Sequence, residues 1–545
     1  MENHFSRNRN FYILVLAAVI STLPLYFKTP AIVDVLMHGT FTKHFFSLLQ
    51  EGEIYPRYAY EAFYGYGSYI YFIYPPISLY ISSLFAWFAT DHELYFQALR
   101  LSITLAVIVS AFTSYSWLKS KYGPSAALIG ALFYISFPSL TTAINLTVSM
   151  GMIWCFAWYP VAMSGAERII NGRRKGIFIY ALGLALIVLT NIPASLIFIP
   201  FAGLYILLMK PNIRTVFKLI LSGLLALGLA AIYVIPQLSV LEYINSEILW
   251  KVGDKDFYEL TLIGIEFLKF GLANNYKDIL LTVIVFVIFI IQLIYFLQAR
   301  RRTIKTREFT VAFGLSIAAL VLCSSLSEEL WAAFPILQKV QYGARFFILV
   351  QVFVTMLAVQ TISLKPALAK QLLLFFVLPQ FIFAICLFIT APPAGDMERA
   401  VFAKSTMAPD FTIKSGWINK LRANDFNSPP VEKFIVISGE ASASMQMWKS
   451  RHAEFKLTAG RNTVIEIGRS YIPGWRAEIE GREIPLSKDE ESGLMQLSID
   501  EAVKDKKLVI ELPLLWHEQL GGAVSLFSLA ILLFGLLRRK NPAQN

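Results

Sequence analysis

Long apolar stretches separated by short polar ones make up most of this chain. Runs of about 20 residues with almost no charge have the length that crosses the hydrocarbon of a membrane as a helix. The runs predict twelve transmembrane helices, near residues 11–28, 99–118, 124–141, 147–165, 175–190, 194–210, 215–237, 279–298, 308–325, 346–363, 370–391 and 519–537. The pattern is that of a polytopic α-helical membrane protein.

A second pattern occupies residues 393–517. Apolar and polar residues alternate there in "KFIVIS", "EFKLTAG", "TVIEIG", "WRAEIEG", "LMQLSID" and "KLVIEL". A period of two suits strands with one buried face, and "EGRE" predicts a tight turn at Gly481. We therefore expect a membrane domain over 1–392, a β-sandwich-like domain over 393–517, and a last helix with its tail over 518–545.

Composition and charge agree with the membrane prediction. The 545 residues are 56% hydrophobic and 16% charged, with a mean hydropathy of +0.57, whereas soluble domains carry about 25% charged residues. The net charge is +11, but the basic residues cluster at the ends of apolar runs, as in "LKSKYG", "NGRRKG" and "QARRRTIKTR". This is the positive-inside pattern of cytoplasmic loops, so it does not indicate nucleic-acid binding. The three cysteines lie within apolar runs and indicate neither a disulfide framework nor a metal cluster.

Charge also decides how residues 68–92 are interpreted. If this apolar segment crossed the membrane, the three basic clusters would face outward; if it dips into the outer interface and returns, all of them face the cytoplasm. Its tyrosines and Pro75-Pro76 favour the interfacial segment. The alternative is a thirteenth span with an inverted charge pattern. The outward segments are then 29–98, 238–278, 326–345 and 392–518.

The first outward segment contains a candidate pair of catalytic side chains. Residues 33–51 predict an amphipathic helix that Gly52 ends, which places Asp34 and His38 one turn apart on one face. A carboxylate beside an imidazole could deprotonate a hydroxyl, and Asp34 could ligate a divalent metal ion. The alternative is a capping Asp followed by a solvated His.

Two arginines are candidates for an anionic ligand. Arg57 lies in "EIYPRYAYEAFYGYGSYIYFIYPP", whose aromatic residues and glycines suit a lipid chain or a sugar face, and its fork could pair with a phosphate. An interfacial aromatic belt with a snorkelling Arg is the alternative. Arg345 ends the outward segment 326–345, where it could bind a lipid-linked phosphate or merely a headgroup.

Other enzyme classes are not indicated. The chain has no P-loop, Rossmann, HExxH or GxSxG element in a context where it could operate, so nucleotide chemistry is not expected. It also lacks paired broken helices with midplane charges, which argues against a transporter.

Three motifs carry a family resemblance. "DVLMHGTFTKHFFSLLQEGEIYPRYAYEAFYGYGSYIYFIYPPISLYI", "FPILQKVQYGARFF" and "SYIPGWRAEIEGREIPL" resemble, in this order, segments of bacterial membrane proteins labelled 6-pyruvoyl-tetrahydropterin synthase-related, close to the YfhO-like group. Nothing in the chain supports pterin chemistry. The resemblance implies instead a GT-C glycosyltransferase architecture with juxtamembrane helices in the outer loop 29–98.

The resemblance also implies roles for individual residues. Asp34 would be the catalytic acid, acting as general base or helping to bind a metal, with His38 beside it. The lipid phosphate would be bound by Arg57 and Arg345, and the lipid or sugar passage would be lined by Tyr64, Tyr66 and Tyr74.

The implied function is transfer of a sugar from a polyprenyl-phosphate carrier to a cell-envelope acceptor, on the outer face of the bacterial cytoplasmic membrane. No cofactor is expected apart from a divalent metal ion at Asp34. The alternative is a non-catalytic scaffold, envelope-assembly factor or lipid carrier that keeps this architecture and binds partners through the β-rich domain.

Overall fold

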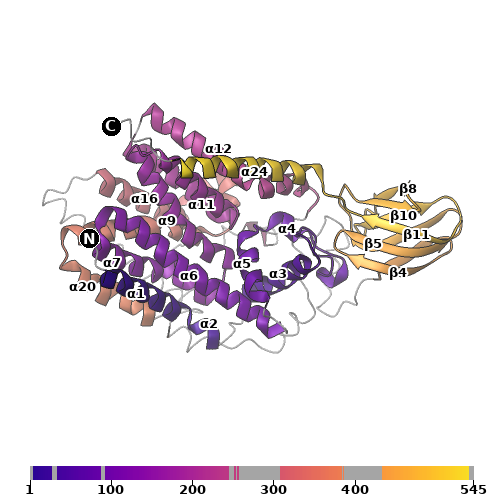
Figure 1. The fold of residues 1–545 in the computed structure, drawn as a ribbon, viewed down its shortest axis with the longest axis horizontal. Coiled ribbons are helices and arrows are strands. Elements are labelled where there is room, and N and C mark those ends of the chain that lie inside the picture. The colour runs from indigo at the N-terminus through magenta and orange to yellow at the C-terminus, as the bar shows by residue number, and fades with distance from the viewer. Residues whose placement is uncertain are drawn as a thin grey trace.

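The computed structural model describes residues 4–27, 33–87, 92–210, 212–244, 251–252, 255–256, 307–382, 385 and 432–538. Within these ranges, the side chains of residues 4–7, 33, 34, 36, 64, 92–94, 146, 147, 251, 252, 255 and 256 are outside the description. Figure 1 shows a helical body with a β-sheet domain projecting from one end.

The helical body is built from long helices and several short ones. The helices are α1 (His4–Thr22), α2 (Pro24–Phe27), α3 (Val33–Gln50), α4 (Ile70–Ile73), α5 (Ile77–Ala86), α6 (His92–Tyr122), α7 (Pro124–Ile135), α8 (Pro138–Thr142), α9 (Met150–Ile170), α10 (Lys175–Val188), α11 (Ile192–Met209), α12 (Ile213–Val240), α16 (Arg307–Cys323), α17 (Glu328–Ala333), α18 (Pro335–Gln338), α19 (Phe347–Leu364), α20 (Leu368–Leu372) and α24 (Trp516–Leu537). Short 3-10 or π turns, η1 (Phe63–Gly65), η2 (Ala143–Thr147), η4 (Ser325–Ser327), η5 (Gly343–Phe346) and η6 (Leu373–Val377), lie between them.

The chain is a multi-pass membrane protein, but the predicted count of twelve spans is not confirmed. In the described part of the chain, five helices are long and apolar enough to cross a membrane, or six if α7 and α8, bent by 41°, form one span. The helix over the predicted span 175–190 has only 14 residues, fewer than the roughly 20 that cross a bilayer. The predicted span 279–298 lies outside the described residues.

Residues 68–92 do not form one continuous helix. The segment breaks at Tyr74-Pro75-Pro76 into α4, with four residues, and α5, with ten. A ten-residue helix is about 15 Å long, half the thickness of the hydrocarbon core. The prolines explain the break, because each removes a backbone donor and restricts the preceding residue. The side of the membrane on which this segment lies stays a prediction.

Prolines inside the long helices expose carbonyl groups that tyrosine and arginine side chains then satisfy. Pro160 within α9 cannot donate to the carbonyl of Phe156, and the Tyr134 hydroxyl of α7 donates to that oxygen at 2.9 Å. Pro236 within α12 leaves the carbonyl of Ile232 without its helical donor in the same way. These freed carbonyls fix the neighbouring elements at defined positions along the helices.

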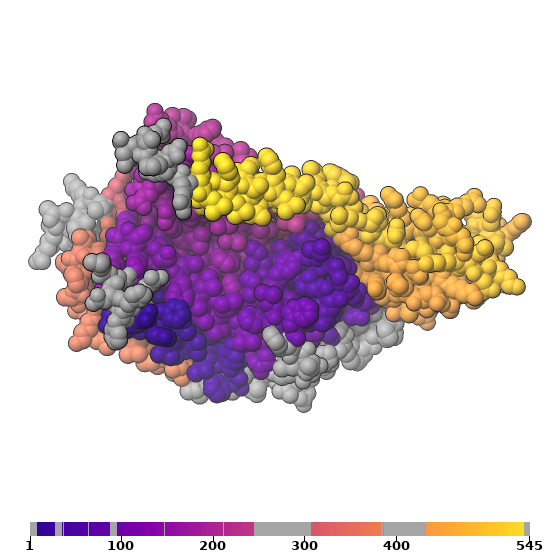
Figure 2. Space-filling view, viewed as in Figure 1, coloured from indigo at the N-terminus to yellow at the C-terminus, as the bar shows by residue number. Residues whose placement is uncertain are grey.

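The last helix, α24, packs along α12 through small residues. Gly228 of α12 faces Ser528, and Gly521 faces the carbonyl of Ala231, so closely that neither glycine has room for a methyl group. Such contacts let helix backbones approach in a membrane. Figure 2 shows α24 on the surface of the helical body, and its outer side chains, among them Phe527 and Leu537, are more than two thirds exposed, as suits contact with lipid.

The β-sheet domain contains two antiparallel sheets. The strands are β3 (Phe434–Ser438), β4 (Ala441–Lys449), β5 (His452–Ala459), β6 (Thr463–Ser470), β7 (Arg476–Ile479), β8 (Arg482–Ile484), β9 (Leu486–Lys488), β10 (Leu494–Ile499) and β11 (Val503–Glu511). The strand orders are β3-β6-β10-β9 and β4-β5-β11-β7-β8. The rings of Phe434 and Phe455, one from each sheet, lie 6.0 Å apart, so the sheets meet in a shared core. A separate two-residue pair, β1 (Lys251–Val252) and β2 (Lys255–Asp256), follows α12.

Every strand predicted from alternation is present. In β5, Phe455 and Leu457 point into the core, and in β11 Leu508 and Ile510 do the same. The predicted turn at Gly481 joins β7 to β8, with Ile479 paired to Arg482 and positive φ at Glu480 and Gly481. Two successive positive φ angles give the turn type that matches the twist of the strands.

Candidate functional site

The predicted amphipathic helix in the first outward segment is α3. Its apolar face is buried, with Val35, Phe41 and Phe45 at 3% exposure or less, and Gly52 follows it with a φ of +95°. Asp34 lies in the first turn of α3, and its side chain lies outside the described part of the chain. The helix therefore has the predicted bounds to within a residue or two.

His38 and Tyr74, both candidates from the sequence, lie in direct contact. The Nδ1 atom of His38 is 3.2 Å from the hydroxyl of Tyr74, and the rings are 5.7 Å apart. Phe41, one turn after His38 on α3, packs against the Tyr74 ring at 5.2 Å. His38 is only 4% exposed, so the alternative prediction of a solvated histidine is wrong.

The N-terminal end of α9 lies close to this contact. An added Cβ at Gly151 would lie 3.4 Å from the Tyr74 hydroxyl and 2.8 Å from the carbonyl of Thr190. The same Cβ would be 3.3 Å from Nδ2 of Asn191, the residue that caps the N-terminus of α11. The hydroxyl of Tyr74 therefore lies close to His38 of α3, to Gly151 of α9 and to the polar groups that precede α11.

A buried cation close to α3 was not predicted from the sequence. Arg100 of α6 is 7% exposed and lines a small cavity together with Leu25 of α2, Val35 of α3 and Val148. Val35 directly follows Asp34, so the Arg100 side chain belongs to the surroundings of the first turn of α3. The available signal was a charge just inside an apolar run, which is costly in a membrane unless it has a partner.

The predicted metal ion is not tested by the described side chains. No three His, Cys, Asp or Glu side chains among them could hold a metal ion, and Asp34 is not one of the side chains considered. Cys155 and Cys323 are buried free thiols within the helical body. A divalent metal ion at Asp34 therefore stays a prediction.

Arg57 is not placed as the phosphate-binding prediction requires. Its side chain is 1% exposed, and its Nη2 donates at 2.7 Å to the carbonyl of Ile232, which Pro236 deprives of a helical donor. Another nitrogen, Nη1, donates to the carbonyl of Tyr71 at 3.4 Å, and the guanidinium lies 3.5 Å above the ring of Tyr55. With its fork occupied in this way, Arg57 has a structural role, and we correct the prediction accordingly.

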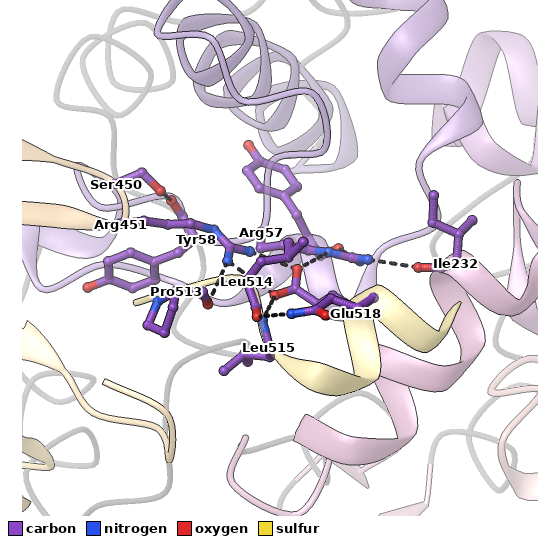
Figure 3. Close-up of polar contacts among 11 residues, drawn as sticks. Arg57, Tyr58, Ile232, Ser450, Arg451, Pro513, Leu514, Leu515 and Glu518 are labelled. Atoms are coloured by element: carbon purple, nitrogen blue, oxygen red, sulfur yellow. Dashed lines mark hydrogen bonds and ion pairs between the residues drawn. The ribbon is translucent and has the colours of Figure 1, made fainter. Parts of the chain in front are cut away.

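The remaining partner of Arg57 connects three parts of the chain (Figure 3). Its Nε lies 3.2 Å from Oε1 of Glu518, in the first turn of α24, and Arg451, between β4 and β5, donates to both oxygens of the same carboxylate at 2.7 and 3.1 Å. Arg451 also donates to the carbonyl of Pro513. We call Arg57, Glu518 and Arg451 the junction triad, because it joins the outer loop, the β-sheet domain and the last helix.

Aromatic side chains extend this junction. Trp475, of the "PGW" motif, donates through Nε1 to the hydroxyl of Tyr69 at 2.9 Å, and Tyr69 donates to the carbonyl of Ser470. Tyr58 packs against Tyr69 with ring centroids 4.6 Å apart. Burial raises the pKa of Tyr58 to about 12. The "PGW" turn therefore has a structural role at the base of the β-sheet domain.

A second buried arginine, Arg469 of β6, lies beside these rings. Its guanidinium is 4.1 Å from the ring of Trp448 and 5.3 Å from that of Trp475, and Nη1 donates to the carbonyl of Ser450. Burial lowers the pKa of Arg469 to about 10. Its aromatic and carbonyl partners stabilise the contact between the outer loop and the domain.

Arg345 contacts residues of its own loop. It lies in η5 and is partly exposed, with Nη1 donating to the carbonyl of Val340 and to Oε1 of Gln341.

Of the two other predicted tyrosines, Tyr64 and Tyr66, the structure describes only the side chain of Tyr66. The carbonyl of Tyr66 accepts hydrogen bonds from the Tyr58 hydroxyl and from the backbone and side chain of Ser470, so Tyr66 belongs to the junction with the β-sheet domain. Burial raises the pKa of the Tyr66 side chain to about 12. The side chain of Tyr64 lies outside the described part of the chain.

Comparisons with known proteins give structural similarity only. No family model and no curated protein matches the chain. The crystal structure of the apo oligosaccharyltransferase from Archaeoglobus fulgidus is similar with a TM-score of 0.42 and 15% identity, over 78% of this chain and 59% of that one. Its complex with Zn and sulfate matches with a TM-score of 0.38 and 16% identity, over 70% and 54%.

A third solved structure, archaeal oligosaccharyltransferase AglB from Archaeoglobus fulgidus with an inhibitory peptide and a dolichol-phosphate, has a TM-score of 0.35 and 14% identity, over 78% and 59%. The chain thus spans less than two thirds of the length of these proteins. At this level, the similarity assigns neither a residue role nor an activity. The names 6-pyruvoyl-tetrahydropterin synthase-related and YfhO-like stay predictions.

Proposed function

We propose that this protein is a membrane glycosyltransferase of the GT-C type, which moves a sugar from a polyprenyl-phosphate donor to a cell-envelope acceptor. The observation that carries the proposal is the buried contact between His38 and Tyr74 near the start of α3. Arg100 is buried near Val35 of the same helix, and Asp34 lies one turn before His38. Buried ionisable and polar groups gathered at one end of a membrane helix bundle are typical of a functional site.

The proposed reaction needs a base and a stabilised leaving group. The acceptor hydroxyl attacks the anomeric carbon of the sugar, its proton passes to the Asp34 carboxylate, and the bond from that carbon to the phosphate oxygen breaks. The polyprenyl phosphate leaves with the bonding electrons, and a cation stabilises its charge. Arg345 is the candidate for this contact, whereas Arg57 is excluded because the junction triad occupies it.

His38 and Tyr74 would act as positioning residues in this proposal. Their mutual contact at 3.2 Å fixes both rings against Phe41, next to the turn that carries Asp34. A divalent cation bound at Asp34 would supply additional charge stabilisation for the leaving phosphate. Tyr64 and Tyr66 remain candidates for the lipid or sugar passage.

Replacement of the proposed base tests the function. Asp34→Asn keeps the size of the side chain and removes its charge, so we expect sugar transfer to fall by about 100-fold or more. The measurement is transfer of labelled sugar from an extracted polyprenyl-phosphate donor into envelope material by the purified protein in liposomes. The matched control is Glu61→Gln, an exposed acid of the same loop, which we expect to leave transfer unchanged. Full transfer by a correctly folded Asp34→Asn variant would refute the proposal.

The firm attachment of the β-sheet domain favours a second candidate function, a non-catalytic scaffold or lipid carrier. Three elements of the chain meet in the junction triad, so the domain is held at a fixed position above the helical body. A scaffold of this kind would keep its cellular function with Asp34→Ala and lose it when residues 393–517 are deleted. The opposite result, loss with Asp34→Ala, favours the enzyme.

A further inference from the structure

A polar cavity lies at the end of the helical body opposite the β-sheet domain. Its volume is about 390 Å³, and it is lined by Ser120, Lys121, Ser164, Glu167, Arg168, Ile170, Asn171, Arg173, Tyr205, Met209 and Glu308. Helix α24 begins next to β11, and near its other end Gly535 contacts Phe178, three residues after the start of α10. The turn before α10, which contains Arg173, is therefore remote from the β-sheet domain (Figure 1).

The acidic side chains of this cavity already have partners. Lys121 contacts Glu308 and lies 3.8 Å from Glu167. Glu167 also accepts from Nε1 of Trp117 at 3.0 Å, and Glu308 accepts from the Tyr205 hydroxyl at 3.2 Å. Both glutamates are 8% exposed. We call Lys121, Glu167 and Glu308 the inner cluster.

Two arginines that line the cavity differ from the acidic side chains, because they lack such partners among the described residues. Arg168, at the end of α9, is half-buried, and Arg173, in the following turn, is exposed. Neither guanidinium makes an ion pair or a hydrogen bond with any residue in the described part of the chain. Three basic and two acidic side chains line the cavity, so the formal net charge of its lining is +1.

We propose that this cavity binds a phosphate group through Arg168 and Arg173. Planar guanidinium forks match phosphate oxygens, and Ser164 and Asn171 add neutral hydrogen-bonding groups beside them. A phosphodiester carries one negative charge, which would neutralise the formal charge of the lining. The cavity volume also lies within the range of small-ligand sites, roughly 300–1,000 Å³.

The chemistry points first to the headgroup of an anionic phospholipid. The cavity opens between helix ends, at the basic "NGRRKG" turn that the positive-inside pattern places on the cytoplasmic face. Basic pockets between membrane helices on that face are suited to phosphorylated headgroups. A free phosphate compound has the same recognition chemistry and is the other source to be distinguished. The site is separate from the contact between His38 and Tyr74 and does not depend on the proposed transferase activity.

Binding to the purified full-length protein in detergent tests the proposal. Native mass spectrometry would measure retention of phosphatidylglycerol and of phosphatidylcholine, and thermal-shift titration would measure inorganic phosphate. We expect the double variant Arg168→Gln, Arg173→Gln to weaken phosphatidylglycerol binding about tenfold or more, since two charge-assisted contacts are lost. The matched control is Arg174→Gln, the exposed neighbour that does not line the cavity, and it should bind as the unaltered protein does.

The binding results distinguish a lipid headgroup from a free phosphate compound as the ligand. Arginine-dependent binding of phosphatidylglycerol but not of inorganic phosphate assigns the site to a lipid, and arginine-dependent binding of inorganic phosphate alone assigns it to a soluble compound. Binding of both probes that is unchanged in the double variant, or equally reduced by Arg174→Gln, overturns the proposal. If the double variant does not fold, Arg173→Gln alone, which alters an exposed side chain, gives the same test.

Discussion

Two buried ionic clusters lie at opposite ends of the helical body, and they are built in opposite ways. In the junction triad, two arginines share the carboxylate of Glu518, and their other donors go to backbone carbonyls. In the inner cluster, two glutamates share Lys121 beside a cavity of about 390 Å³. The first is closed by protein atoms, and the second borders a space that a ligand can enter.

This difference distinguishes a structural role from a binding role. Each nitrogen of the Arg57 guanidinium already donates to a carboxylate or a backbone carbonyl, and the side chain is 1% exposed, so Arg57 joins elements rather than binding phosphate. Arg168 and Arg173 keep their donors, although Arg168 directly follows the paired acid Glu167 and Arg173 lies in the turn after the same helix. Burial alone therefore does not indicate a ligand site; the decisive feature is whether the protein already satisfies the charged group.

The largest expected effect is that of removing the shared carboxylate of the junction triad. Glu518→Ala leaves two cations, one of them fully buried, without an anion, and we expect a loss of about 3–5 kcal/mol in the free energy of unfolding. Thermal unfolding in detergent measures the loss, and limited proteolysis between β11 and α24 reports whether the domain detaches. The control is Glu490→Ala, whose side chain is 86% exposed and pairs with Lys488. That exposed pair should cost no more than about 1 kcal/mol, and equal losses from both variants would contradict the structural role.

A smaller loss is expected at the inner cluster. Lys121→Met leaves Glu167 and Glu308 without their shared cation, but the adjoining cavity lets water reach the carboxylates, so we expect a cost of about 1–3 kcal/mol. Thermal unfolding measures it, with Lys175→Met, an exposed cation at the same end of the body, as control. A loss as large as that of Glu518→Ala would show that the inner cluster is as closed as the junction triad, and the contrast between them would be wrong.

The sequence predicted local features well and long-range pairings poorly. The alternation in "KLVIEL" and the turn at Gly481 depend on residues a few positions apart, and both are present. The strand β4, "ASASMQMWK", was missed, because it lies at the edge of its sheet and its first half alternates only between the small residues Ala and Ser, which differ little in hydrophobicity. Likewise, α3 was predicted within a residue or two, since its apolar face and Gly52 are local signals.

At the candidate functional site, too, the sequence predicted only what local signals reveal. Asp34 and His38 were grouped by their spacing, whereas Tyr74 was named only through the family resemblance. Nothing local indicates that Arg57 pairs with Glu518, which is 461 residues away, or that Arg100 lies beside the first turn of α3. These contacts arise from packing between elements that are distant in the sequence, so local patterns in one sequence do not predict them.

The smallest expected effect sharpens the role of Arg57 itself. Arg57→Lys keeps the positive charge near Glu518 but loses the planar fork, so the carbonyl of Ile232 loses its donor at a cost of about 1–2 kcal/mol. That carbonyl needs a side-chain donor only because Pro236 has no N–H. In a Pro236→Ala background the helix supplies the missing bond, and Arg57→Lys should then cost measurably less. A double-mutant cycle on thermal unfolding gives the coupling between the two positions. If the two changes are additive, the freed carbonyl is not what holds Arg57, and the attraction to Glu518 alone accounts for its place in the junction triad.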